Sequence, residues 1–313
     1  MNQLSNSSIE VIVILGPTAT GKTRLAVQLA DQMRGEIISA DSRQVYRGMN
    51  IGTGKDLDEY IINGNKTPYH LIDIVEPMEE YNVAQFQEDC HRVISEIKNR
   101  DKLPIICGGT GFYIKSVLMG FEFPMIGPDN KLRQELAYWT LEDLKLKLKN
   151  ISPKAYANNP LDTRRRLIRA IEIEINRGKV KDIRNKAKRK VQNPLVVGME
   201  YPRRVIRERI TARLNDRLKN GMIEEIENLL QNGVTHDRLK SFGLEYRFIS
   251  EFIQGDITKS EMTAQLNTAI HRFAKKQMTF IRNMEKNGIQ IHWISEGNIN
   301  EVLNVIDKRI LLL

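Results

Sequence analysis

The sequence predicts an α/β fold, in which helices flank a parallel sheet and a mostly helical domain is inserted into the chain. In the first part of the chain, short apolar runs alternate with amphipathic helical patterns, as in strands joined by crossover helices. Further on, the chain becomes rich in lysine and helical in period, and strand-like runs return only later. We therefore expect a core formed by 1–119 and 193–313, interrupted by an inserted helical domain at 120–192.

The expected elements can be placed in chain order. Val11–Leu15 is a continuous apolar run and predicts a buried strand. The apolar positions of Thr23–Met33 share one helical face, and Gly35 should end that helix. By the same rules we expect strands at 36–40, 70–75, 104–107, 195–199 and 289–294, and helices at 83–100, 203–219, 221–232 and 259–286.

Composition argues against several classes of protein. The 313 residues are 41% hydrophobic, but no run approaches the roughly 18 to 20 apolar residues of a membrane span. The first residues contain neither a basic end nor an apolar run, so secretion is not expected. Cys90 and Cys107 are too few for a disulfide framework or a zinc site. We expect a cytoplasmic monomer without membrane contact.

The net charge of +9 is concentrated in one segment. Between Arg164 and Lys190 there are twelve basic and three acidic residues, so the rest of the chain is close to neutral. On a helix over 163–173 the arginines would project outward, where their planar forks can bind phosphates in a bidentate way. The pattern favours salt-sensitive binding to an RNA backbone, and a solvated charged face is the alternative. The few aromatic residues nearby predict no base-stacking platform.

A phosphate-binding motif lies between the first strand and the first helix. The segment matches G-x-x-x-x-G-K-[ST] in full, with Gly16, Pro17, Thr18, Ala19, Thr20, Gly21, Lys22 and Thr23. Its backbone N–H groups can surround an anion at the helix N-terminus, Lys22 can neutralise phosphate oxygens, and the Thr23 hydroxyl can bind Mg²⁺. An ordinary glycine-rich turn is the alternative.

The motif leaves the phosphate compound open, because a diphosphate ester presents the same oxygens as the end of a nucleotide. A kinase or ATPase would add an apolar strand that ends in a Walker-B aspartate. Asp73 is the nearest candidate, but it lies inside its apolar run.

Polar residues follow two other expected strands. Because the carboxyl ends of parallel strands meet at one edge, Asp41 should lie beside the phosphate loop. There it can act as a general base, and a turn or helix-capping role is the alternative. Cys107–Gly111 supplies flexible backbone and the Thr110 hydroxyl at the same edge, or else a plain tight turn.

The sequence resembles the tRNA dimethylallyltransferase (IPP transferase) family. The matching segments stand in the family's order, and they are Gly16–Thr23, Ser39–Met49, Tyr69–Asp73, Gly108–Tyr113, Arg165–Glu172 and Phe273–Gln277. The resemblance implies a P-loop NTPase-like core and an inserted domain that closes over the tRNA anticodon arm. It also implies transfer of a dimethylallyl group from dimethylallyl diphosphate to N6 of the adenine just 3′ of the anticodon.

The same resemblance assigns residue roles. Asp41 would be the base, Thr18 and Arg213 would bind the leaving diphosphate, and Mg²⁺ would be the cofactor. Contacts to tRNA would come from Asp41, Ser42, Arg43, Gln44, Thr110, Arg133, Arg165, Arg166, Leu167, Ile168 and Arg169. The sequence departs from the family pattern at Ser241–Arg247, and it lacks the zinc-finger extension of eukaryotic members, so a bacterial-type enzyme is expected.

Two rival functions follow from the residues alone. One is a small-molecule or nucleotide kinase with Arg164–Arg169 as a lid, and the other is an RNA-binding NTPase. Both predict tight ATP binding, whereas prenyl transfer consumes no ATP.

Overall fold

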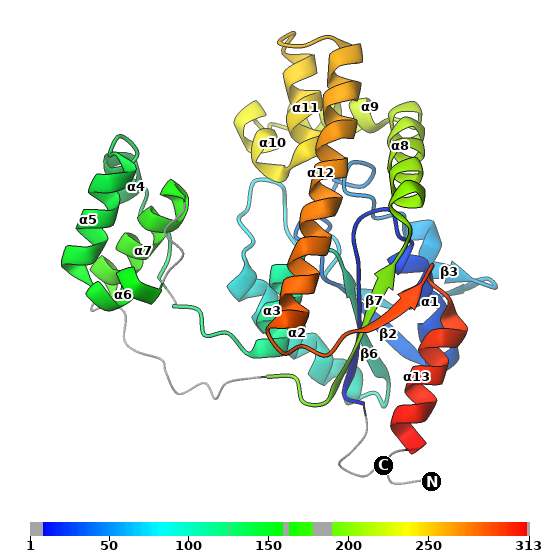
Figure 1. The fold of residues 1–313 in the computed structure, drawn as a ribbon. Coiled ribbons are helices and arrows are strands. Elements are labelled where there is room, and N and C mark those ends of the chain that lie inside the picture. Colours follow the sequence, from blue (N-terminus) through cyan, green and yellow to red (C-terminus); the bar gives the residue numbers. More distant parts are fainter. Residues whose placement is uncertain (1–8, 125, 159–162, 178–189, 312–313) are drawn as a thin grey trace. The chain divides into compact units, whose positions relative to one another are not determined.

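The computed structural model describes residues 9–124, 126–158, 163–177 and 190–311, and the chain divides into two units (Figure 1). The first unit comprises Met1–Gly120 and Arg189–Leu313, and the second comprises Phe121–Lys188. The insertion expected at 120–192 and the second unit cover nearly the same residues.

The first unit is built on a six-stranded parallel sheet, with strand order β5-β2-β6-β1-β7-β8. The strands are β1 (Val11–Leu15), β2 (Gly35–Ser39), β5 (Tyr69–His70), β6 (Leu103–Gly108), β7 (Pro194–Glu200) and β8 (His292–Ser295). The β1 strand is fully buried, because helices cover both faces of the sheet.

Four helices and the end of a fifth cover the two faces. On one face, α2 (Val83–Lys98), α3 (Gly111–Met119) and the C-terminal part of α12 (Lys259–Lys286) pack against the sheet. On the other, α1 (Lys22–Met33) and α13 (Ile299–Leu311) do so. A short turn of 3₁₀ helix (Leu57–Tyr60) and a hairpin of β3 (Ile61–Ile62) and β4 (Asn65–Lys66) lie beside α1.

A group of helices with its own apolar core lies beyond the carboxyl ends of the strands. Figure 1 shows β7 running directly into the first of them. The group consists of α8 (Arg203–Lys219), α9 (Met222–Gln231), α10 (His236–Phe242), α11 (Leu244–Ile253) and α12. Val45, Tyr46 and Met49, which follow β2, are buried in this core and so join the helices to the sheet.

The second unit is a small helical bundle around six buried side chains. Its helices are α4 (Asn130–Leu136), α5 (Leu141–Ile151), α6 (Pro153–Asn158) and α7 (Arg164–Asn176). The Glu172 carboxylate is fully buried here and accepts hydrogen bonds from two arginines, which compensates the cost of burying its charge.

Two expectations about elements were wrong. The strand expected at 70–75 consists only of Tyr69–His70, because Leu71 and Asp73 adopt positive φ angles of 60° and 55° that no strand allows. The first helix ends at Met33 and is capped by Arg34, whose φ is 52°, whereas Gly35, which was expected to end the helix, begins β2. Glycine is needed there because a Cβ would lie 2.9 Å from the carbonyl oxygen of Leu103.

The other predicted strands and helices are present within a few residues of their expected bounds. Outside the inserted domain, the helices α3, α10, α11 and α13 were not predicted. The α3 sequence is apolar on almost all sides because it is buried against both α2 and α12, so it shows no clear helical period.

Candidate functional site

Three adjacent strands end at the same edge of the sheet. The ends of β2, β6 and β1 carry Asp41, Thr110 and the phosphate loop, respectively. The Thr110 hydroxyl accepts a hydrogen bond from Ser42 N at 3.1 Å, and Thr110 N donates to Ala40 O at 3.2 Å. Gly108 permits this close approach, because a Cβ there would lie 2.3 Å from Ala40 O.

The phosphate loop curls between β1 and α1 with positive φ angles at Ala19 (64°) and Gly21 (76°). The Lys22 ammonium donates a hydrogen bond to Pro17 O at 2.7 Å, inside the loop. Burial lowers the pKa of Lys22 to about 8. A cation so weakly solvated has much to gain from an anion bound in the loop.

Gln277 on α12 joins the phosphate loop to the β6 end. Its side-chain oxygen accepts a hydrogen bond from Thr18 N at 2.9 Å, and its amide nitrogen donates to Gly109 O at 3.0 Å. The sequence match included this glutamine without a role, so the bridge is visible only in the fold.

Two arginines of α8 approach the loop. Arg213 lies 3.4 Å from the Thr18 hydroxyl and 2.8 Å from the Asp56 carboxylate. Arg217, one helical turn later, donates to the same Asp56 oxygen at 3.2 Å. Arg217 and Asp56 were not predicted, although the four-residue spacing of the arginines does place them on one helix face.

A cavity beside the loop combines cationic and apolar walls. Its lining residues are Thr18, Ala19, Ile210, Arg213, Leu214, Arg217, Met222, Glu245 and Ile270. Burial raises the pKa of Glu245, which disfavours a negative charge at that wall. Its walls therefore offer guanidinium groups that would attract an anionic head and aliphatic side chains that would contact a short apolar tail.

Asp41 lies in the turn that follows β2. Its Oδ1 accepts a hydrogen bond from Arg43 N at 2.9 Å. Asp41 therefore stabilises the turn, which was the alternative role considered for it. Within the described part of the chain, Oδ2 has no hydrogen-bond partner. Gln44 fixes the turn from both sides, since it accepts from Ser39 Oγ at 2.8 Å and donates to Gly54 O at 2.9 Å.

The Ser241–Arg247 segment, where the sequence departs from the family pattern, contacts the same turn. The Arg43 guanidinium donates to Ser241 O at 2.9 Å and lies 5.7 Å from the centre of the Phe242 ring. The segment spans the junction of α10 and α11, where Gly243 has a φ of 130°.

Of the residues in the second unit that the resemblance assigns to tRNA, some hold the bundle together. Arg133 forms a bidentate pair with Glu172 at 2.9 and 3.0 Å, and Arg169 also pairs with Glu172. Arg165 and Arg166 at the start of α7 are exposed. The run from Lys179 to Arg189 lies outside the described residues.

Leu167 and Ile168 belong to the apolar side of α7. Leu167 has no exposed surface, and Ile168 packs against the same core. Any contact of Leu167 with RNA would therefore have to come from its backbone, because its side chain lies on the packing face of the helix.

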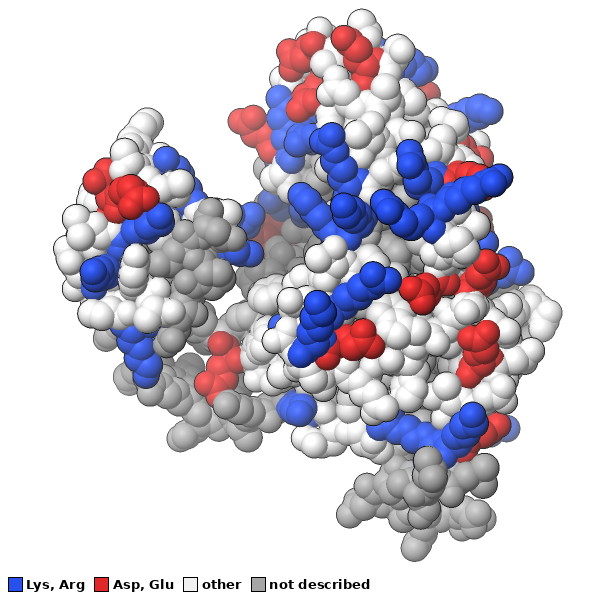
Figure 2. All heavy atoms as spheres, viewed as in Figure 1, with Lys and Arg blue, Asp and Glu red and all other residues white. Residues whose placement is uncertain are grey.

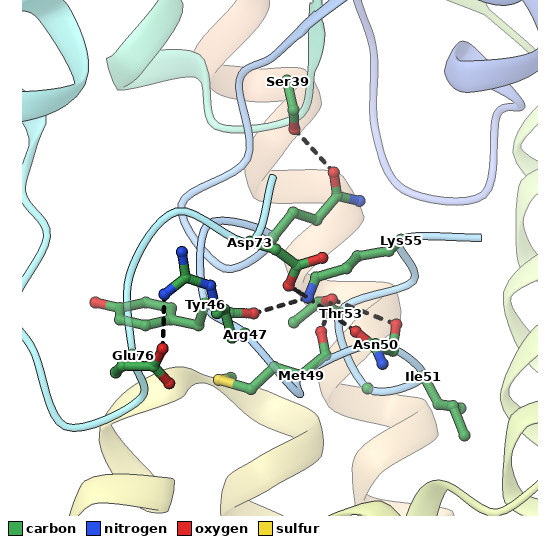
Figure 3. Close-up of polar contacts among 12 residues, drawn as sticks. Ser39, Tyr46, Arg47, Met49, Asn50, Ile51, Thr53, Lys55, Asp73 and Glu76 are labelled. Carbon is green, nitrogen blue, oxygen red and sulfur yellow. Dashed lines mark hydrogen bonds and ion pairs between the residues drawn. The ribbon is translucent and has the colours of Figure 1, made fainter. Parts of the chain in front are cut away.

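Asp73 does not serve as a Walker-B aspartate here. It follows the two-residue β5 in a loop and forms an ion pair with Lys55, as Figure 3 shows. Among the described residues, no group of three or more His, Cys, Asp or Glu side chains could hold a metal ion. No helix within the described ranges is long and apolar enough to cross a membrane.

Comparisons with known proteins agree on one family. A family model described as IPP transferase matches residues 44–284, and one described as isopentenyl transferase matches residues 9–75. The chain is 46% identical over 301 residues to tRNA dimethylallyltransferase 1 of Azobacteroides pseudotrichonymphae genomovar. CFP2, covering 96% of this chain and 97% of that protein. It is 47% identical over 287 residues to tRNA dimethylallyltransferase 2 of Shewanella sediminis, covering 92% and 93%.

Solved structures agree with this. The full-length tRNA isopentenylpyrophosphate transferase from Bacillus halodurans has a TM-score of 0.69 and 33% identity, and the match covers 97% of each chain. A eukaryotic dimethylallyltransferase acting on tRNA has a TM-score of 0.74 and 25% identity, covering 94% of this chain and 75% of that one. With a family model over more than half of its length and relatives this similar along nearly all of it, the chain belongs to the IPP transferase family.

Proposed function

We propose that this protein transfers a dimethylallyl group from dimethylallyl diphosphate to N6 of the adenine immediately 3′ of the anticodon in tRNA, with release of diphosphate. Its similarity to tRNA dimethylallyltransferases makes it an enzyme of prenyl transfer. The observation that carries the proposal for the donor is the cavity beside the phosphate loop, whose arginines and aliphatic side chains match the two ends of this molecule.

The nucleophile needs help from the site. The lone pair of an exocyclic adenine amine is delocalised into the ring, so the amine must be oriented and lose a proton as it attacks. Asp41 suits this task, because one carboxylate oxygen is held by Arg43 N while the other has no partner among the described residues. We assign Asp41 as the base, and Ser42, Arg43 and Gln44 as its neighbours that contact tRNA.

The leaving group needs positive charge that is already in place. As the bond between C1 and oxygen lengthens, negative charge grows on the diphosphate. The loop amides, Lys22 and Arg213 stabilise that charge more in the transition state than in the ground state, which lowers the barrier. The Thr18 hydroxyl, which lies 3.4 Å from Arg213, can donate a hydrogen bond to the same diphosphate.

Mg²⁺ bound together with the diphosphate would be held on the protein side by Thr23. The Thr23 hydroxyl has no hydrogen-bond partner among the described residues, and together with diphosphate oxygens and waters it makes an oxygen donor set of the kind Mg²⁺ prefers. When bound, the ion would neutralise charge on the diphosphate.

The adenine must leave its stack, which costs a few kcal/mol that backbone contacts can offset. Exposed arginines at the start of α7 provide such contacts in the second unit. In the first unit, Figure 2 shows Lys and Arg side chains gathered across the face of α12 and α8. The exposed basic residues there include Arg203, Arg204, Arg207, Arg209, Arg272, Lys275 and Lys276.

One assay tests the proposal against a kinase or an RNA-binding NTPase. The protein is incubated with Mg²⁺, labelled dimethylallyl diphosphate and an anticodon stem-loop that has adenine 3′ of the anticodon. We expect label on this RNA and none on a matched stem-loop with guanine at that position. Failure to transfer label, together with RNA-stimulated ATP hydrolysis, would support the rivals.

The ion pair of Asp73 with Lys55 does not support a kinase or an RNA-binding NTPase, since the expected Walker-B carboxylate is then not available to a bound nucleotide.

We also propose that the enzyme acts in the cytoplasm as a monomer. Light scattering during size-exclusion chromatography tests the monomer, for which the mass is 36.1 kDa.

A further inference from the structure

Lys55 is a buried cation that the proposed reaction does not use. Its side chain is only 1% exposed. Its ammonium donates hydrogen bonds to Tyr46 O at 2.7 Å, to Asn50 Oδ1 at 2.9 Å and to the Asp73 carboxylate, and Figure 3 shows it directed between these three groups. Three acceptors, one of them charged, satisfy all three donors of the ammonium and so compensate its burial.

A short series of hydrogen bonds leads from Lys55 to Asp41. The Tyr46 carbonyl is held by Lys55, and Tyr46 N donates to Arg43 O at 3.2 Å. Arg43 N in turn donates to the Asp41 carboxylate at 2.9 Å. The Asp73 segment supports the same turn, because Asp73 N donates to Gln44 O at 3.1 Å. The shape of the turn that carries Asp41 therefore depends on the pair formed by Lys55 and Asp73.

The loop at 50–56 that carries Lys55 also reaches the diphosphate side of the site. Asp56, the next residue, binds both Arg213 and Arg217. Gly54 lies so close to these guanidinium groups that a Cβ would meet Arg217 Nη2 and Arg213 Nη2 at 1.7 and 2.2 Å.

Glu225 on α9 fixes this loop from behind. Its carboxylate accepts hydrogen bonds from three successive backbone amides, Asn50, Ile51 and Gly52, at 2.7, 2.6 and 3.0 Å. Because these three amides are held in place, the loop cannot easily shift to compensate for the loss of Lys55, and the effect of a substitution should reach the Asp41 turn.

We infer that Lys55 is a positioning residue for prenyl transfer. By holding Tyr46 O and Asp73 in one place, it sets the Asp41 carboxylate at a fixed position relative to the arginines that Asp56 contacts. The inference rests on the proposed function, since it concerns the alignment of adenine, base and donor. It predicts that loss of Lys55 lowers turnover more than it lowers the binding of either substrate.

Two variants test it. Lys55→Met keeps the length of the side chain and removes the charge, and Asp73→Asn keeps an acceptor and tolerates a positive φ while removing the partner's charge. We expect Lys55→Met to lower kcat by about 10- to 100-fold, as for a small misplacement of reacting groups. Asp73→Asn should have a smaller effect in the same direction. The Kd for inorganic diphosphate and for the stem-loop should change by no more than about threefold in both.

A matched control separates alignment from general loss of stability. Glu36 is also buried on β2, but it lies at the amino end of the strand, where it binds His70 and Arg100. Glu36→Gln should lower the melting temperature and leave kcat near that of the wild type. If folded Lys55→Met has a kcat within about twofold of the wild type, or if Glu36→Gln loses as much turnover, Lys55 has no positioning role.

A readout independent of turnover keeps the inference separate from the proposed function. Amide hydrogen exchange at 42–47 should be faster in Lys55→Met and Asp73→Asn than in the wild type and unchanged in Glu36→Gln. Unchanged exchange in both variants would refute the inference. If Lys55→Met does not fold, Asp73→Asn decides by the same measurements. A wild-type protein that transfers no label, combined with faster exchange in the variants, would refute only the proposed function.

Discussion

At the scale of single residues, the site depends on side chains that form one hydrogen bond within the protein and can still bind a substrate. One carboxylate oxygen of Asp41 accepts a hydrogen bond within its own turn, and the Lys22 ammonium donates a hydrogen bond to a single carbonyl within the phosphate loop. Each side chain is therefore oriented before any substrate arrives, which reduces the reorganisation that the reaction requires.

Asp41→Asn should separate the base from the turn. Asparagine keeps an oxygen for the bond from Arg43 N, so the turn should survive, but an amide cannot take a proton. We expect kcat to fall by about 10²- to 10⁴-fold, as for loss of a general base, with the stem-loop Kd almost unchanged. Single-turnover transfer of label and filter binding measure the two quantities. A large loss of RNA affinity with preserved turnover would rule out the assigned role.

Lys22 should make diphosphate binding depend on pH. Its pKa of about 8 in the free protein means that the ammonium form, which attracts the anion, is lost as the pH rises through 8. Affinity for inorganic diphosphate should weaken by up to about tenfold per pH unit above that value, and binding there should take up a proton. Calorimetry from pH 7 to 9.5 measures both effects.

Lys22→Met is the control for that experiment, because it leaves the titration of the ligand itself unchanged. The difference between wild type and variant isolates the lysine. Equal pH profiles for the two proteins would show that Lys22 does not bind the anion.

At the scale of elements, helix α12 connects the phosphate loop to the end of β6. Gln277 binds the phosphate loop at Thr18 and the β6 end at Gly109. In the second unit Glu172 has a comparable structural role, since it binds Arg133, Arg169 and the amide of Asp129. In both places a single side chain ties together segments that are far apart in sequence.

Gln277→Ala should loosen the phosphate loop. Two partly buried hydrogen bonds are lost, each worth about 1 kcal/mol, so the melting temperature should fall. The KM for dimethylallyl diphosphate should rise by about 3- to 30-fold, because Thr18 N is no longer held in place. Thr279→Ala, an exposed change on the same helix, should alter neither quantity. A normal KM in Gln277→Ala would show that the bridge is only structural.

At the scale of the whole molecule, positive charge lies on both units. The basic face of α8 and α12 belongs to the first unit, whereas the arginines at the start of α7 belong to the second. If either surface binds RNA phosphates, its affinity for RNA should fall steeply with salt.

Arg165→Ala tests the contribution of the second unit. If Arg165 contacts one phosphate, the slope of log K against log salt should become shallower by about 0.9 to 1, and affinity should fall for all sequences alike. Binding isotherms from low to moderate salt measure the slope. Arg92→Ala is the control, because Arg92 is exposed on α2 but already paired with Asp89 and Glu96. Equal slopes for wild type and Arg165→Ala would favour a solvated face.

Much of the fold could be predicted because its strands and helices follow local patterns of apolar residues. Strand β1, helix α1 and the long α12 were predicted from continuous apolar runs and helical spacing. The shortened β5 could not be predicted, since its apolar residues continue past the point where positive φ angles end the strand. The missed α3 shows the same limit, because a helix buried on several sides loses its periodic signal.

The phosphate loop, the strand ends that carry Asp41 and Thr110, and the family can be recognised in the sequence, because these depend on motifs and on spacing along the chain. Which side chains meet is known only from the folded structure. The contacts of Gln277 with Thr18, of Arg213 with Asp56 and of Lys55 with Asp73 join residues 259, 157 and 18 positions apart. Such pairs leave no periodic trace in the sequence, because folding alone brings their backbones together.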